Sequence, residues 1–128
     1  MSDAVRVELV EGPLGQAGSP PPPGAGAWVT FEGIVRPLED DRQLVALDYE
    51  AYEPMTKREL QRLAAKVVEE HGLLAIVVEH SVGRVTVGET SFRLSVGSAH
   101  RAEAIAATDA FIERMKRDVP LWKTAVYA

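Results

Sequence analysis

Two segments with helical spacing of their apolar residues, separated by strand-like segments, constrain the fold of this chain more than any other feature. In residues 54–72 and again in residues 99–118, apolar side chains recur at intervals of three and four. Pro54 suits the first turn of the first helix and Gly72 suits its C-cap, whereas Pro120 stops the second helix. Each segment is therefore predicted to be an amphipathic helix with one buried face. In the second helix this face is expected to carry Ala104, Ile105, Thr108, Phe111, Ile112 and Met115.

The segments around the two helices alternate with period two or are almost continuously apolar, which predicts strands. The predicted strands are residues 5–10, 27–36, 43–53, 73–83, 84–89, 90–98 and 121–128. Gly33 indicates a bulge or a close backbone approach in the second strand. One face of the third strand is expected to carry Val45, Leu47, Tyr49 and Ala51. From residue 43 onward the order is β-α-β-β-β-α-β, so we expect an α+β fold with a mostly antiparallel sheet and a ferredoxin-like βαββαβ core plus extra strands.

The length and composition fit one soluble domain. The chain has 128 residues, 46% of them hydrophobic and 26% charged, so we expect a single domain over residues 1–128. Residues 11–25 are rich in Pro and Gly and are predicted to form a surface loop. There is no apolar run of membrane-spanning length and no leader-like N-terminus, so the expected location is cytoplasmic.

Charge and cysteine content exclude several function classes. The net charge of −5 argues against general binding of nucleic acid, which depends on many contacts from Lys and Arg to phosphates. The chain has no cysteine, so it has no thiolate nucleophile and no zinc–sulfur site. A basic binding site on this protein must therefore be local.

The start of the second helix carries two basic side chains, His100 and Arg101, although the helix macrodipole disfavours cations there by roughly 0.3–1 kcal/mol each. Ser98 is the expected N-cap. A phosphate or carboxylate among these donors and the free backbone N–H groups would remove the penalty. The alternative is a surface pair in which His100 and Arg101 bind acids such as Glu103.

Three further cations are candidate site residues. Lys116 follows Ile112 by four residues, so its stem lies at the edge of the apolar stripe, and partial desolvation there suits an acid, a base or a nucleophile. The alternative is a lysine whose ammonium reaches water. Lys123 follows Trp122 beyond the turn at Pro120, either near the end of the same helix or as a strand-edge cation over an aromatic ring. Arg36 ends a predicted strand, where it binds either a ligand or an acidic side chain.

Other polar residues are interpreted as structural. His71 and His80 are expected at a helix end and a strand end, and Asp48, Glu50 and Glu53 are expected on a solvated face. No nucleophile elbow, phosphate-binding glycine loop or metal-spaced His/Glu pair is present. Taken alone, these residues indicate an α+β domain with a local anion site.

Four segments in register resemble the MoaE family, the large catalytic subunits of molybdopterin synthase. They are GAWVTFEGIVR, LDYEAYEPM, VGSAHRAEAIAATDAFIERMK and VPLWK. The resemblance runs from about Gly26 to Lys123 and implies the family's α/β hammerhead fold. The chain departs from the family pattern at Ser81, where the family has arginine, and at Thr124.

The resemblance implies a sulfurtransferase of molybdenum cofactor biosynthesis. The family converts precursor Z, a cyclic pyranopterin monophosphate, into the dithiolene of molybdopterin. The sulfur comes from the C-terminal thiocarboxylate of a ubiquitin-like MoaD-type small subunit, and no metal or other cofactor is required. The family forms a homodimer within a heterotetramer. The lack of cysteine fits, because an enzyme without its own thiol depends on another protein to bring the sulfur.

The resemblance also assigns roles to six residues. Lys116 and Lys123 fall on the family's catalytic lysines, with Lys116 the favoured acid/base or the amine that captures the partner's acyl end. The substrate-binding positions are Arg36, His100, Arg101 and Phe31, and His100 and Arg101 are expected to reach the site of the neighbouring subunit. Two alternatives remain. One is a non-catalytic module that docks a ubiquitin-like partner, and the other is a nucleotide or RNA binder, which the net charge disfavours.

Overall fold

A computed structural model describes residues 4–128 and contains two helices and seven strands. In chain order the elements are β1 (Val5–Glu11), β2 (Ala27–Ile34), β3 (Leu38–Glu39), β4 (Arg42–Ala51), α1 (Met55–His71), β5 (Ala75–Thr86), β6 (Thr90–Ser98), α2 (Arg101–Asp118) and β7 (Leu121–Tyr127). The expected α+β class is confirmed. The sheet is mostly antiparallel, since only β1 and β5 pair in parallel.

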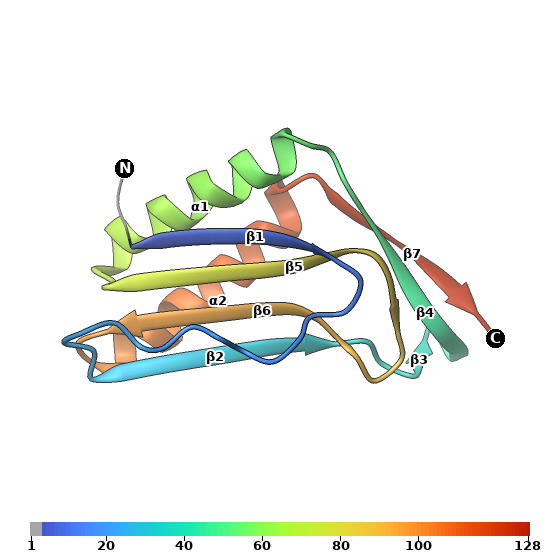
Figure 1. The fold of residues 1–128 in the computed structure, drawn as a ribbon, viewed down its shortest axis with the longest axis horizontal. Helices are drawn as coiled ribbons and strands as arrows, with labels where there is room; N and C mark the ends of the chain where they lie inside the picture. The colour runs from blue at the N-terminus through green and yellow to red at the C-terminus, as the bar shows by residue number, and fades with distance from the viewer. Residues whose placement is uncertain (1–3) are drawn as a thin grey trace.

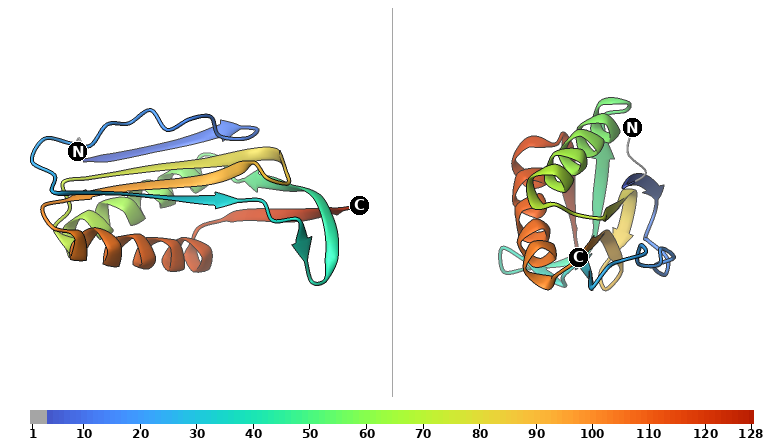
Figure 2. Two further views of the ribbon diagram at one scale, coloured as in Figure 1. Left: turned by 90° about the horizontal axis from the view of Figure 1, so that it is seen from below. Right: turned by 90° about the vertical axis from the view of Figure 1, so that its left-hand side faces the viewer.

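The strands form one sheet in the order β2-β6-β5-β4-β3, with β1 also paired to β5 and β7 paired to β4. β4 and β7 cross the ends of the other long strands at a steep angle (Figure 1). Both helices cover the same face of the sheet (Figure 2). The main core lies between the two helices and the sheet, and it includes Leu60, Val67, Leu94 and Phe111, each fully buried. A smaller cluster of Val35, Leu44, Leu47 and Val85 fills the end where β4 and β7 cross.

β5 is a single long strand, so the predicted break between residues 83 and 84 is wrong. Its first part lies between β1 and β6, and from Gly83 onward it pairs with β4. Gly83 has φ +81°, a conformation that a non-glycine residue adopts only with strain. The glycine thus changes the direction of the strand without ending it. The core order from β4 onward becomes β-α-β-β-α-β, with one strand fewer than expected.

Two bulges alter the strand faces. The predicted irregularity at Gly33 is confirmed by a shift of register between Gly33 and Ile34 in the pairing with β6. A second shift lies between Leu44 and Ala46 in the pairing of β4 with β7. Val45 is the extra residue and is 45% exposed, so it does not share the face of Leu47 as expected. The bulge instead allows Leu44 and Leu47 to enter the same cluster.

The helices differ from expectation in detail. α1 ends at Gly72, a left-handed C-cap whose N–H donates to the carbonyl of Val68, as predicted. α2 begins at Arg101 with His100 at the N-cap, and Ser98 is the last residue of β6. The hydroxyl of Ser98 donates to the carbonyl of His100, so Ser98 is not the helix cap that was expected.

The predicted buried stripe of α2 is correct except at two positions. Ile105 is 56% exposed, whereas Ala107, which was not in the stripe, is fully buried. Both residues are small or apolar, and the pattern of apolar positions does not distinguish them. α2 packs against β2 and β6, and at this turn Ala107, two positions after Ile105, belongs to the buried face.

The Pro- and Gly-rich segment between β1 and β2 lies across the sheet face opposite the helices (Figure 2). Its backbone is anchored to the strands, with Gly12 N donating to Val82 O at 2.8 Å and Leu14 N donating to Thr90 O at 2.9 Å. Arg93, a buried arginine of β6, donates a hydrogen bond from the sheet to the carbonyl of Gly15 in this segment. The predicted surface loop is therefore a fixed cover for the second face of the sheet.

Within residues 4–128, neither helix combines the length and apolarity needed to cross a membrane.

Candidate active site

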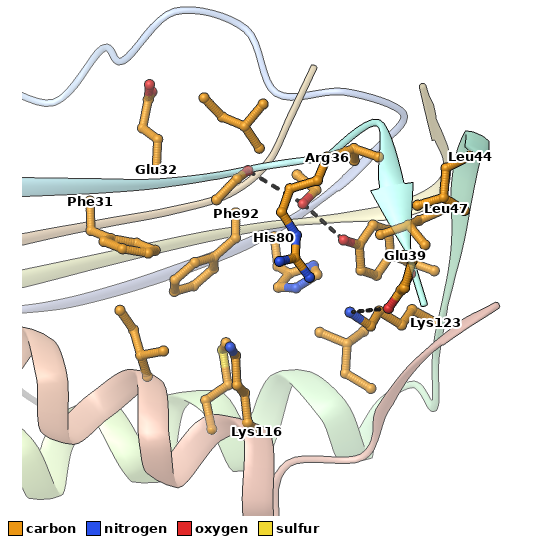
Figure 3. A pocket seen from close by; sticks show the side chains of 18 residues that line it. Phe31, Glu32, Arg36, Glu39, Leu44, Leu47, His80, Phe92, Lys116 and Lys123 are labelled. Carbon is orange, nitrogen blue, oxygen red and sulfur yellow. Dashed lines mark hydrogen bonds and ion pairs between the residues drawn. The ribbon is translucent and has the colours of Figure 1, made fainter. Parts of the chain in front are cut away.

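A cavity of about 700 Å³ opens between the C-terminal part of α2 and the sheet, where β4 and β7 cross its end. Its walls come from the end of β2 and the segment after it, from β4, β5 and β6, and from α2 and β7. Figure 3 shows Arg36 entering from the sheet side, Lys116 from α2, and Lys123 from β7. Four of the six predicted site residues line this cavity, namely Phe31, Arg36, Lys116 and Lys123. Residues far apart in the sequence thus meet at one place.

The cavity has a local excess of positive charge. Lys123 Nζ lies 3.7 Å from Glu39 Oε1, which is the one ion pair between lining residues within 4–128. Glu32 also lines the cavity, but its carboxylate points away from it (Figure 3) and pairs with Arg93 at 2.6 Å. Arg36 and Lys116 have no ion-pair partner in the described part of the chain. Two free cations on opposite walls suit an anionic ligand.

Lys116 is exposed to solvent in this single chain, so the expected partial desolvation is not found here. Lys116 comes directly after Met115, which is buried. The Lys116 side chain projects from the last turns of α2 toward the cavity (Figure 3). Lys123 is half exposed, and its strand neighbour on β4 is Tyr49. The start of β7 is fixed by Thr56, whose buried hydroxyl accepts from Tyr52 N at 2.7 Å and donates to Pro120 O at 2.6 Å.

Aromatic rings form the floor of the cavity. Phe31 lies 6.0 Å from Phe92, Phe92 lies 5.6 Å from His80, and His80 meets Tyr49 edge to face at 5.0 Å between ring centroids. The Tyr49 hydroxyl is 2.9 Å from Ser91 Oγ, and burial raises the pKa of this tyrosine. The floor is thus rich in aromatic rings, which are tilted or edge-on to one another, so a planar ligand can stack on one of these rings at a time.

His80 is a lining residue that the sequence analysis treated as structural. It lies inside β5 on the same face as Ile76 and Val78, and the predicted position at a strand end is wrong. Burial lowers the pKa of His80 to about 4, although the carbonyl of Ser81 opposes this by accepting a hydrogen bond. One signal of this position was present in the sequence. In β5 every second residue is apolar and faces the core, and His80 stands where this pattern calls for another apolar residue. Glu39 and Tyr49 were also missed, because only the pairing of β4 with β3 and β7 brings them to the site.

His100 and Arg101 do not line this cavity. They lie at the opposite end of α2 from Lys116, and the rise along an α-helix puts about 22 Å between Arg101 and Lys116. His100 Nδ1 is 3.7 Å from Glu103 Oε2, which is the surface pair considered as an alternative. Within one chain, His100 and Arg101 are therefore separate from the cavity.

Comparisons with known proteins agree with one another. The family model described as MoaE protein matches residues 11–118. A molybdopterin synthase catalytic subunit of Arabidopsis thaliana is 39% identical over 105 residues, which is 82% of this chain and 53% of that protein. One of Thermoplasma volcanium is 41% identical over 101 residues, which is 79% of this chain and 74% of that protein. A solved molybdopterin synthase from Staphylococcus aureus superposes with a TM-score of 0.83 at 27% identity, covering 94% of this chain and 90% of that one.

The chain spans about half the length of the plant relatives that it matches, 53% in each case. The region matched by the family model nevertheless includes β2 to β6 and both helices, whereas β7 and nearly all of β1 lie outside it. Family model, relatives and fold all point the same way, and the chain belongs to the MoaE family.

Proposed function

We propose that this protein is the catalytic subunit of a molybdopterin synthase and transfers sulfur from a MoaD-type small subunit to precursor Z. The observation that carries the proposal is the meeting of Phe31, Arg36, Lys116 and Lys123 at one cavity. These four residues come from β2, from the segment after it, from α2 and from β7. The names of the relatives, molybdopterin synthase catalytic subunits, support the same activity.

The charge and shape of the cavity suit the proposed substrate. A pyranopterin is flat and polar, and one of its faces packs against the ring of Phe31, which is 40% exposed at the cavity. Its cyclic phosphate is an anion, and Arg36 is the free cation placed to hold it from the sheet side. His100 and Arg101 lie too far along α2 to act in the same chain, so we assign them to the site of the neighbouring subunit in a homodimer.

Each sulfur transfer replaces oxygen by sulfur and needs no oxidant. The thiocarboxylate sulfur attacks a substrate carbon, a C–S bond forms and a C–O bond breaks. Over the two transfers the cyclic phosphate opens and one water is lost. Water then attacks the acyl carbon of the thioester, the partner leaves as a carboxylate, and the thiol stays on the product. Lys116 and Lys123 screen the two negative reactants, and Lys116 donates the proton to the departing oxygen.

The proposed assembly is a homodimer of this chain with one small subunit at each end. The partner is recognised by its ubiquitin-like body and by a C-terminal Gly-Gly tail that enters the cavity toward Lys116. No metal or organic cofactor takes part, because the partner supplies the sulfur. We place the protein in the cytoplasm, where precursor and partner would be available to it.

The test is a reconstituted reaction with thiocarboxylated small subunit and precursor Z, read as the fluorescent oxidised pterin of the product. The variants are Lys116→Ala and Lys123→Ala, and Lys57→Ala is the matched control because Lys57 is an exposed lysine of α1 that does not line the cavity. The proposal predicts product with the unaltered chain and the control, and a loss of at least about a hundredfold in kcat for Lys116→Ala.

Binding of the small subunit without product formation would overturn the proposed catalytic activity and favour a non-catalytic module that docks the ubiquitin-like partner. In that case the unaltered chain and Lys116→Ala bind the partner equally and neither forms product. Equal turnover by Lys116→Ala and Lys57→Ala would contradict the role given to Lys116.

A further inference from the structure

His80 is a buried imidazole whose two ring nitrogens have different surroundings. Only 5% of the residue is exposed, and Nδ1 lies 2.8 Å from the carbonyl oxygen of Ser81. A carbonyl oxygen accepts but does not donate, so Nδ1 carries the proton of the neutral ring. Nε2 is then the unprotonated nitrogen, with a lone pair that accepts hydrogen bonds.

The neighbours of His80 hold its ring in place and disfavour its charged form. Tyr49 packs against one part of the ring at 5.0 Å and Phe92 against another at 5.6 Å. The charged or titratable groups that face the cavity from other elements are Arg36, Glu39, Tyr49, Lys116 and Lys123. Three of them are cations, and one of the cations is already paired with Glu39, so the surroundings favour a neutral imidazole.

Nε2 has no hydrogen-bond partner within residues 4–128. It is also not sealed from solvent, because Ser81 Oγ is the one fully enclosed side-chain polar atom without a partner in that range. His80 lines the same cavity as Arg36 (Figure 3). A fixed acceptor is therefore left open at the floor of a cavity that also holds three cationic donors, Arg36, Lys116 and Lys123.

We propose that His80 is a positioning residue whose neutral Nε2 accepts a hydrogen bond from an N–H group of the molecule bound in the cavity. This inference rests on the proposed function, which supplies two molecules with such a group. One is the pterin ring of the precursor, and the other is the amide backbone of the partner's C-terminal tail. Both present the same chemistry to Nε2, an uncharged N–H donor that a cationic side chain cannot satisfy.

The first test uses the full chain with ¹⁵N-labelled histidine. Precursor Z and the small subunit with an ordinary carboxylate end are added in separate samples, and the Nε2 signal of His80 is followed by NMR. We expect this signal to begin as an unprotonated nitrogen and to move toward a hydrogen-bonded value in one of the two samples. That sample identifies the donor as pterin or tail. The signals of His71, at the end of α1 and outside the cavity, are the control and should not move.

The outcomes separate this inference from the function on which it rests. If neither molecule perturbs backbone amide signals around the cavity, the proposed function fails and this inference fails with it. If either molecule perturbs those amides while the Nε2 signal of His80 stays in place in both samples, only the role of His80 is overturned. A free protein whose Nε2 already carries a proton would also overturn it.

The second test compares His80→Phe with His80→Gln. Phenylalanine keeps a flat ring between Tyr49 and Phe92 but has no acceptor, whereas the glutamine oxygen reaches about as far as Nε2. We expect His80→Phe to raise KM about tenfold with kcat nearly unchanged, and His80→Gln to recover most of the loss. Equal defects in two variants with the same melting temperature would contradict the proposal. So would loss of a limb of the pH–rate profile in His80→Phe, because that would show proton transfer by His80. If His80→Phe does not fold, the NMR measurement on the unaltered chain decides.

Discussion

Replacing Arg93 tests how the segment between β1 and β2 is held on the sheet face opposite the helices (Figure 2). The guanidinium is only 3% exposed and donates to Glu32 at 2.6 Å, to Glu79 at 3.4 Å and to the carbonyl of Gly15. Arg93→Ala leaves two carboxylates without their partner, which costs about 3–5 kcal/mol in a buried site. Because Glu32 keeps 39% exposure and hydrates readily, we expect the lower end of that range, about 3 kcal/mol.

Urea unfolding of Arg93→Ala, followed by circular dichroism, measures this loss. With an m value of about 2 kcal/mol per molar, a loss of about 3 kcal/mol lowers the midpoint by about 1.5 M. Arg84→Ala is the matched control, because Arg84 binds Asp48 at 2.8 and 2.9 Å with both side chains largely exposed, and its midpoint should barely change. Arg93→Ala should also speed proteolysis of the segment between β1 and β2, since Gly15 loses its anchor. A midpoint that falls no further than in Arg84→Ala would show that Arg93 does not hold the two carboxylates and the loop on the sheet.

Three other changes have definite expectations. Thr56→Val removes the buried hydroxyl that holds Pro120 and should lower the free energy of unfolding by about 1–3 kcal/mol, whereas an unchanged melting curve would contradict the role of this link. The pKa of His80 is lowered from 6.5 to about 4 in the folded chain, so the unfolded chain binds the extra proton as pH falls through this window. The free energy of unfolding should then drop by roughly 3 kcal/mol between pH 6.5 and 4, and His80→Gln should remove that part of the slope in urea titrations. Glu39→Gln frees Lys123 from its carboxylate and should lower KM for the anionic precursor by about twofold to fivefold, and a raised KM would contradict an anion site.

The helices and most strand ends were predictable because their signals are local. The spacing of apolar residues, Gly72 and Pro120 define where α1 and α2 end without reference to the rest of the chain. The continuity of β5 was not predictable in this way, since Gly83 resembles a turn residue unless the change of partner from β6 to β4 is known. The bulge at Val45 has the same origin, because it depends on the register with β7.

For the cavity too, the residues with local signals were predictable, whereas those that depend on tertiary contacts were not. Lys116 and Lys123 were found by resemblance and by their place at the end of a helix and after a turn, and the structure brings them to one site. His80 was misjudged because its burial depends on Phe92 and Tyr49, which belong to two other strands. The role of Arg93 also depends on tertiary structure, since it binds a loop residue that is distant in the sequence.

Sulfur transfer at this cavity is measured most directly by following the mass of the small subunit's C-terminus during a single round of the reaction. Thiocarboxylated small subunit is mixed with this protein and precursor Z, and intact-mass spectra are recorded over time. We expect sulfur to be replaced by oxygen at the partner's end only when precursor and the unaltered chain are both present, and we expect Lys116→Ala to stop the exchange. A lasting adduct between the chain and the partner would show that Lys116 captures the acyl end, in place of hydrolysis by water. A thiocarboxylate that stays intact on a partner firmly bound to the unaltered chain would contradict the claim that this cavity transfers sulfur.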